Sequence, residues 1–97
     1  MAKIAVRNPN TPGRETNVDA DRYAAMRTAL LIVVPTAPPG ITHAEMVSAV
    51  RPHLPESVFP GGQKVMWWSK TVQLDLEARG LLQRTASRPM RWWQATS

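Results

Sequence analysis

The side chains that could catalyse a reaction are few in this chain and are not grouped. Neither of the two histidines, His43 and His53, has a cysteine or a second histidine at metal-ligand spacing. The serines lack the sharp strand-to-helix turn of a nucleophile elbow. Asp75 and Glu77 would diverge, because residues two apart on a helix do not face each other. Solvated polar residues explain this pattern, so we expect no catalytic residue, no metal site, no cofactor and no enzymatic activity.

A second possible chemistry is nucleotide binding by the stretch Pro60-Gly61-Gly62-Gln63-Lys64. A nucleotide P-loop needs a longer loop with spaced glycines after a strand, and Ser or Thr after its lysine. Two glycines that let a loop lead into a helix are the simpler explanation.

The chain is basic, with a formal net charge of +5 over 97 residues. Residues 61–97 hold six Lys or Arg against two Asp or Glu, a net charge of +4, whereas residues 19–60 are slightly acidic. A nucleic-acid-binding protein would need its charge concentrated in this way. When charge is the only criterion, a solvated surface explains it slightly better.

Residues 64–79 have the pattern of an amphipathic helix. At about 100° per residue, four apolar side chains fall on a side that we expect to be buried: Val65, Trp68, Val72 and Leu76. The opposite side holds Trp67, Lys70, Thr71, Leu74 and Ala78, with Gln73 and Glu77 at its edge. Gly80 should end the helix, because glycine adopts the left-handed C-cap conformation without a Cβ clash. The alternation after Gly80 then indicates a strand.

Leu76 and Glu77, followed by Gly80, Leu81 and Arg84, form a pattern that resembles a known one. A very similar Leu-Glu-x-x-Gly-Leu-x-x-Arg occurs in winged helix-turn-helix regulators of the multiple-antibiotic-resistance repressor type, at the recognition helix and first wing strand. The resemblance implies a mainly α fold with a small β-hairpin, namely three helices plus a C-terminal wing. It also implies a protein that binds double-stranded DNA, such as a transcriptional regulator.

In a winged helix the outer face of the third helix enters the major groove. The groups on this helix that suit phosphates and base edges are Lys64, Ser69, Lys70, Thr71 and Gln73. Residues 81–85 should pair with residues 90–95 across a turn at residues 86–89. Arg88 would then lie at the wing tip, flanked by Arg84 and Arg91, where it would contact the DNA backbone.

An alternative function starts from the apolar residues on the same surface. Trp67 and Leu74 are poor major-groove residues and suit a protein partner or a homodimer on the same scaffold, without DNA binding. Trp92 and Trp93 alternate in the last strand, so at most one of them faces the core. The other would add to this partner-binding surface, unless something else covers it.

Two further helices precede the third. The first should start at Asp19, a good N-cap, and stop at Pro35, with its buried stripe formed by Tyr23, Met26, Leu30 and Val33. The second should start with a capping box of Thr42 and Glu45 and a hydrophobic staple of Ile41 and Met46, bury Val47 and Val50, and end near Arg51 before Pro52.

Residues 1–18 form an N-terminal arm ahead of a single domain at residues 19–97. Residues 3–6 could form a short strand, and residues 8–14 are rich in turn-forming Asn, Pro and Gly. Their role stays open between a loop packed on the core and an arm that reaches a partner.

The whole chain also resembles a family of small uncharacterised bacterial proteins. The shared features are Asn8-Pro9-Asn10, Val18-Asp19-Ala20, Tyr23, Met26-Arg27, Pro39-Gly40-Ile41-Thr42, Glu45-Met46, Phe59-Pro60-Gly61 and the run from Trp67-Trp68 through Lys70 to Glu77. This likeness supports the fold class and implies no activity.

No apolar run approaches the roughly eighteen residues of a membrane span, and no long apolar segment follows Lys3 as in a secretory signal. We therefore expect a cytoplasmic protein without membrane contact.

Overall fold

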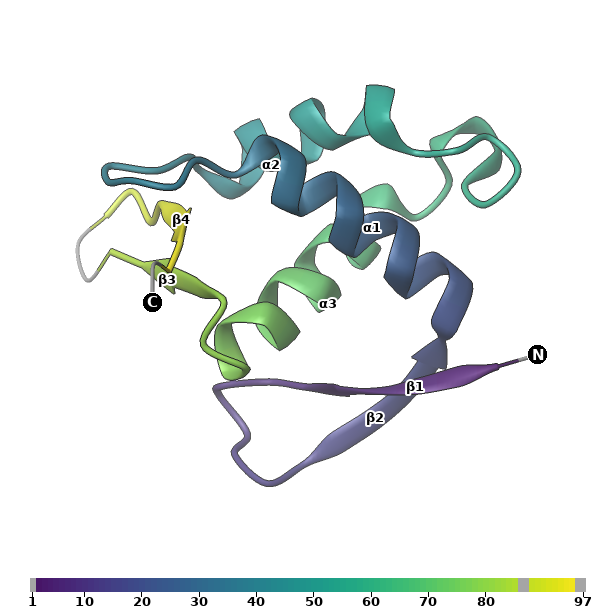
Figure 1. Cartoon of the computed structure of the whole chain (residues 1–97), viewed down its shortest axis with the longest axis horizontal. Helices are drawn as coiled ribbons and strands as arrows, with labels where there is room; N and C mark the ends of the chain where they lie inside the picture. Colours follow the sequence, from purple (N-terminus) through teal and green to yellow (C-terminus); the bar gives the residue numbers. More distant parts are fainter. Residues whose placement is uncertain (1, 86–87, 96–97) are drawn as a thin grey trace.

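The computed structural model describes residues 2–85 and 88–95. These ranges contain three α-helices and two antiparallel β-hairpins, a mixed α/β arrangement (Figure 1). The elements in chain order are β1 (Lys3–Arg7), β2 (Glu15–Asp19), α1 (Ala20–Val33), α2 (His43–Val50), α3 (Val65–Ala78), β3 (Leu82–Arg84) and β4 (Trp92–Gln94). The sequence predicted the three helices and the C-terminal hairpin but no hairpin at the N-terminus.

Helix α1 begins as predicted, because the Asp19 side chain accepts hydrogen bonds from the backbone N–H groups of Asp21 and Arg22. Three members of the predicted stripe are buried: Tyr23, Met26 and Leu30. Val33, the fourth, is only half-buried, and Val34 after the helix end is buried instead.

Helix α2 confirms the predicted capping box. The Thr42 hydroxyl accepts from the Glu45 backbone N–H at 3.2 Å, and the Glu45 carboxylate accepts from the Thr42 backbone N–H at 2.9 Å. Met46, Val47 and Val50 are buried, and the helix gives way to a 3₁₀ turn at Arg51–His53.

Helix α3 is the central element and contacts α1, α2, β1 and β3. The predicted stripe of Val65, Trp68, Val72 and Leu76 is buried. Gly80 ends the helix at φ +78°, and the Leu81 N–H returns to the Leu76 carbonyl at 2.8 Å. The left-handed cap that the glycine predicted is confirmed, and the hydrogen bond from Leu81 makes it a Schellman motif.

The N-terminal hairpin β1–β2 packs on α3 and α1 (Figure 1). Its register pairs Ile4 with Val18 and Val6 with Thr16, and the side chains of Val6 and Val18 join the core. Two residues of the segment that the sequence set apart as an arm, Val6 and Val18, are therefore part of the domain core.

The C-terminal hairpin β3–β4 pairs Leu82 with Gln94 and Arg84 with Trp92. Residues 86 and 87 of its predicted turn lie outside the described residues. A backbone bridge joins this hairpin to the segment before α2. The Ile41 N–H donates to the Trp92 carbonyl at 2.9 Å, and the Trp92 N–H donates to the Ile41 carbonyl at 2.8 Å. Gly40 allows the approach, because a Cβ there would lie 2.1 Å from the Trp92 carbonyl oxygen.

No helix in the described ranges is long and apolar enough to cross a membrane.

Candidate nucleic-acid interface

The solvent-facing side of α3 is narrower than the sequence predicted. Met66, Trp67 and Lys70 are exposed, while Thr71 and Leu74 are half-buried. Ser69 and Gln73, both predicted to contact DNA, are fully buried. The expectation that the Gln73 flank of this helix is open to solvent is therefore wrong.

Packing on the side of α3 that faces α2 and the β3–β4 hairpin accounts for the burial of both residues. The Ser69 hydroxyl donates to the Met66 carbonyl at 2.9 Å and lies 3.2 Å from Nε2 of His43 at the start of α2. Gln73 donates through Nε2 to the Glu77 carboxylate. Its Oε1 is buried without a hydrogen-bond partner in the described ranges. Neither side chain can reach a nucleic acid in this structure.

The Ser69–His43 contact could suggest a nucleophile with its base, but its geometry argues against catalysis. Ser69 is inaccessible, and its proton is directed to a backbone carbonyl. Burial, with a smaller contribution from the positive charge of Lys70, lowers the pKa of His43 below its usual value. Neutral His43 is a packing residue here.

Glu77 organises the side of α3 that faces the β3–β4 hairpin, a role that the sequence did not reveal. Its carboxylate accepts from Nε1 of Trp92 at 2.7 Å and pairs with Nε of Arg84 at 3.2 Å. Arg91, the other predicted flanking cation, pairs with Glu45 at 3.5 Å. Arg84 and Arg91 thus each have a carboxylate partner within the chain, and only part of their charge is available to a ligand.

Several other cations have no such partner. In residues 2–85 and 88–95 no carboxylate forms a salt bridge with Lys64, Lys70 or Arg88, and all three are exposed. Nζ of Lys70 lies 5.6 Å from the centroid of the Trp92 ring, where a cation–π contact orients it beside β4.

The tryptophans divide as the alternation predicted. Trp92 is buried and Trp93 is half-buried, so one of the two faces the core. The burial of Trp92 removes it from the predicted partner-binding surface. Trp67 stays on that surface, with 54% of its area exposed, and Met66 beside it is 65% exposed.

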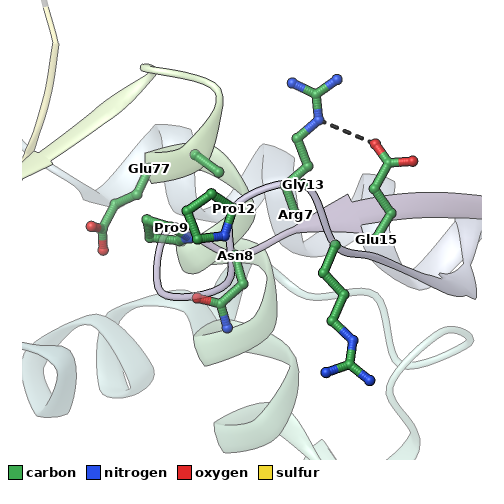
Figure 2. A pocket seen from close by; sticks show the side chains of 9 residues that line it. Arg7, Asn8, Pro9, Pro12, Gly13, Glu15 and Glu77 are labelled. Atoms are coloured by element: carbon green, nitrogen blue, oxygen red, sulfur yellow. Dashed lines mark hydrogen bonds and ion pairs between the residues drawn. The ribbon is translucent and has the colours of Figure 1, made fainter.

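A cleft of about 480 Å³ separates the loop of the N-terminal hairpin from the end of α3. Figure 2 shows Pro9 and Pro12 together in this cleft, between Glu77 and an exposed ion pair of Arg7 with Glu15 at 3.3 Å. The two carboxylates offset the arginines that line the cleft, so it attracts anions less than the Lys70 side does.

A buried polar cluster fixes the other flank of α3. The Asp75 carboxylate accepts a hydrogen bond from the Tyr23 hydroxyl. It also accepts from Nε of Arg79, which lies 2.9 Å from each of its two oxygens. Burial, then the hydrogen bond to Asp75, raises the pKa of Tyr23 to about 12. The sequence analysis considered Asp75 only as a poor partner for Glu77. Arg79 lies one helical turn away from Asp75, whereas Tyr23 lies 52 positions away along the chain.

Among the described residues, no three His, Asp or Glu side chains gather as a metal site would need.

The chain was compared with protein-family models, curated proteins and solved structures. Residues 3–92 match the model of a family described only as a family of unknown function. No curated protein and no solved structure matches the chain.

Proposed function

The chain belongs to the family of unknown function DUF6958, and we propose that it is a winged helix-turn-helix protein of the cytoplasm that binds double-stranded DNA. Helix α3 faces the major groove, and Arg88 of the C-terminal hairpin contacts the backbone. The protein has no catalytic role in this proposal.

The observation that carries the proposal is the pair of backbone hydrogen bonds between Ile41 and Trp92, at 2.9 and 2.8 Å. They attach the β3–β4 hairpin to the segment that leads into α2. As a result, the hairpin stands beside the α2–α3 pair, as a wing stands beside a helix-turn-helix (Figure 1). Arg88 lies in the connection between β3 and β4 and is exposed.

The groups that remain available favour contacts with phosphates over contacts with base edges. Lys64 and Lys70 on α3 and Arg88 on the wing are exposed cations, and Thr71 is a half-buried hydroxyl. Ser69 and Gln73 are buried, so the groove-facing side lacks the amide that pairs with adenine. We therefore expect binding that depends weakly on base sequence and strongly on charge.

The test is the binding of fluorescein-labelled random duplex DNA, followed by fluorescence anisotropy at low salt. The double variant Lys70→Glu with Arg88→Glu should lose at least about tenfold in affinity, because two phosphate contacts become repulsive. Arg51→Glu is the matched control: it reverses one exposed cation at the opposite end of α2 from the capping box. Equal losses in the two proteins, or no binding by the wild type, would overturn the proposal.

The exposure of Met66 and Trp67 favours a second candidate function, a protein-interaction or dimerisation module on the same scaffold. Leu74 on the same helix and Trp93 on the last strand are half-buried and expose further apolar area. Sizing over a range of protein concentrations tests the dimer. Dimerisation through this helix requires self-association that persists at high salt and is lost in Trp67→Ala.

A further inference from the structure

We propose that the hollow beside Trp67 binds an unpaired base of a nucleic-acid strand, with the base stacked on the indole and the adjoining phosphates held by Lys3, Arg22 and Lys64. This inference rests on the proposed nucleic-acid function and adds to it a second, single-stranded contact. The hollow adjoins the N-terminal half of α3 and does not include the wing.

The hollow has a volume of about 520 Å³ and lies where the base of the N-terminal hairpin meets the starts of α1 and α3. This volume falls within the range of pockets that accept small organic ligands. Trp67 and Trp68 line it, and so do three cations and the amide side chain of Asn17. An aromatic ring, cations and an amide are the groups that a nucleotide requires for its base, phosphate and base edge.

The Trp67 ring is both exposed and held in place. It makes an edge-to-face contact with the buried Trp68 ring, with centroids 5.1 Å apart and planes at 84°. Trp68 in turn contacts Phe59 in the same manner at 6.2 Å. Because this chain of rings fixes the exposed indole, stacking a base on it should cost little conformational entropy.

The charges around the ring favour an anion. In the described ranges no carboxylate forms a salt bridge with Lys3, Arg22 or Lys64. Arg22 donates through Nε to the Val58 carbonyl at 3.3 Å, and its terminal nitrogens form no hydrogen bond with another described residue. Asp19 is the one carboxylate that lines the hollow, and the N-terminal amides of α1 already bind it.

Lys64 occupies a backbone conformation that is unfavourable for a lysine. Its φ of 60° and ψ of 19° are left-handed, a region that glycine adopts without a steric cost. Gly61 and Gly62, shortly before it, also have positive φ, and a glycine at position 64 would adopt this conformation without strain. A lysine retained at such a position is consistent with a role for its ammonium group.

A nucleotide strand explains the combination of features better than an acidic peptide does. Peptide carboxylates would satisfy the three cations but would leave the exposed indole face without a flat partner. A base covers that face, and its phosphates reach the cations that line the same hollow.

The test measures the binding of a labelled thymidine oligonucleotide of roughly 12 nucleotides, within the site sizes of single-strand binders. Trp67→Ala should weaken its binding about tenfold, and Trp67→Phe should restore most of the loss because a ring remains. Lys64→Gly should weaken it several-fold while leaving the thermal unfolding temperature unchanged or higher. Arg51→Glu again serves as the control, and circular dichroism checks that each variant is folded.

The outcomes separate this inference from the duplex proposal. The double variant Lys70→Glu with Arg88→Glu should weaken duplex binding more than oligonucleotide binding. Trp67→Ala should weaken oligonucleotide binding more than duplex binding. Duplex binding that fails beside Trp67-dependent oligonucleotide binding would refute only the duplex proposal. An oligonucleotide affinity unchanged in Trp67→Ala, or equal competition by a poly-glutamate peptide, would overturn the inference.

Discussion

The backbone N–H of Arg7 donates to Oδ1 of Asp75 at 2.8 Å, and this bond joins residues that lie 68 positions apart in the chain. It satisfies a donor on the free edge of β1. Arg79 covers the same edge by donating to the Ala5 carbonyl at 3.0 Å. The Asp75 carboxylate therefore holds the N-terminal hairpin, α1 and α3 together, and with them the walls of the hollow beside Trp67.

Loss of the Asp75 carboxylate should destabilise the whole domain. We expect Asp75→Ala to lower the free energy of unfolding by about 3 kcal/mol, because Tyr23, Arg79 and the Arg7 amide all lose their acceptor. Urea denaturation followed by circular dichroism measures the loss. Glu15→Gln breaks the exposed Arg7–Glu15 pair and should cost less than about 1 kcal/mol. Similar losses in the two variants would contradict this role of Asp75.

Tyr23, the single tyrosine of the chain, should lose its proton at a higher pH than a free tyrosine does. The pKa of Tyr23 is raised from 10.0 to about 12, so the folded state favours the neutral phenol. Its contribution to stability is complete below pH 10.0 and is lost as the pH rises toward about 12. Ultraviolet absorbance of the phenolate gives the pKa directly, with urea-unfolded protein as the reference. A folded-state pKa equal to that of the unfolded chain would refute the buried Tyr23–Asp75 contact.

His43 should make stability depend on pH in the opposite direction. Its pKa is lowered from 6.5 by burial and by Lys70, so the folded state favours the neutral ring. Stability is complete above pH 6.5 and decreases as the pH falls, because the unfolded chain takes up the proton first. Urea midpoints on either side of that pH, compared between the wild type and His43→Gln, measure the effect. If the wild type and His43→Gln lose the same stability as the pH falls, His43 does not make this contribution.

Two glycines provide a matched test of how the β3–β4 hairpin is attached. Both Gly40 and Gly13 have positive φ, but a Cβ at Gly40 would lie 2.1 Å from the Trp92 carbonyl oxygen, whereas one at Gly13 would meet nothing within 4 Å. Gly13→Ala should cost about 1 kcal/mol through backbone strain alone. Gly40→Ala should cost about 3 kcal/mol or more, because the hairpin must also move away. Equal costs would show that the Ile41–Trp92 bridge is not tight.

Local signals in the sequence predicted the helices well. The Thr42–Glu45 box and the cap at Gly80 depend on residues a few positions apart, so their geometry follows from the sequence alone. The stripe from Val65 to Leu76 was also predictable, because a helix has a fixed period.

The candidate site was less predictable, because contacts between distant segments decide which of its side chains are exposed. Periodicity indicates the buried side of a helix but not the width of the buried arc, and packing against α2 and the β3–β4 hairpin extended that arc over Ser69 and Gln73. The N-terminal hairpin was missed because only Val6 and Val18 of its strands join the core. The hollow beside Trp67 depends on that hairpin and could not be foreseen without it.

The salt dependence of duplex DNA binding tests the central proposal most directly. With Lys64, Lys70 and Arg88 on phosphates, the logarithm of the association constant should fall against the logarithm of salt concentration with a slope of about −3. Replacing Lys70 by Gln should reduce the magnitude of that slope by about 1. A slope near zero, or one that neither Lys70→Gln nor Arg88→Gln changes, would contradict DNA binding by this face.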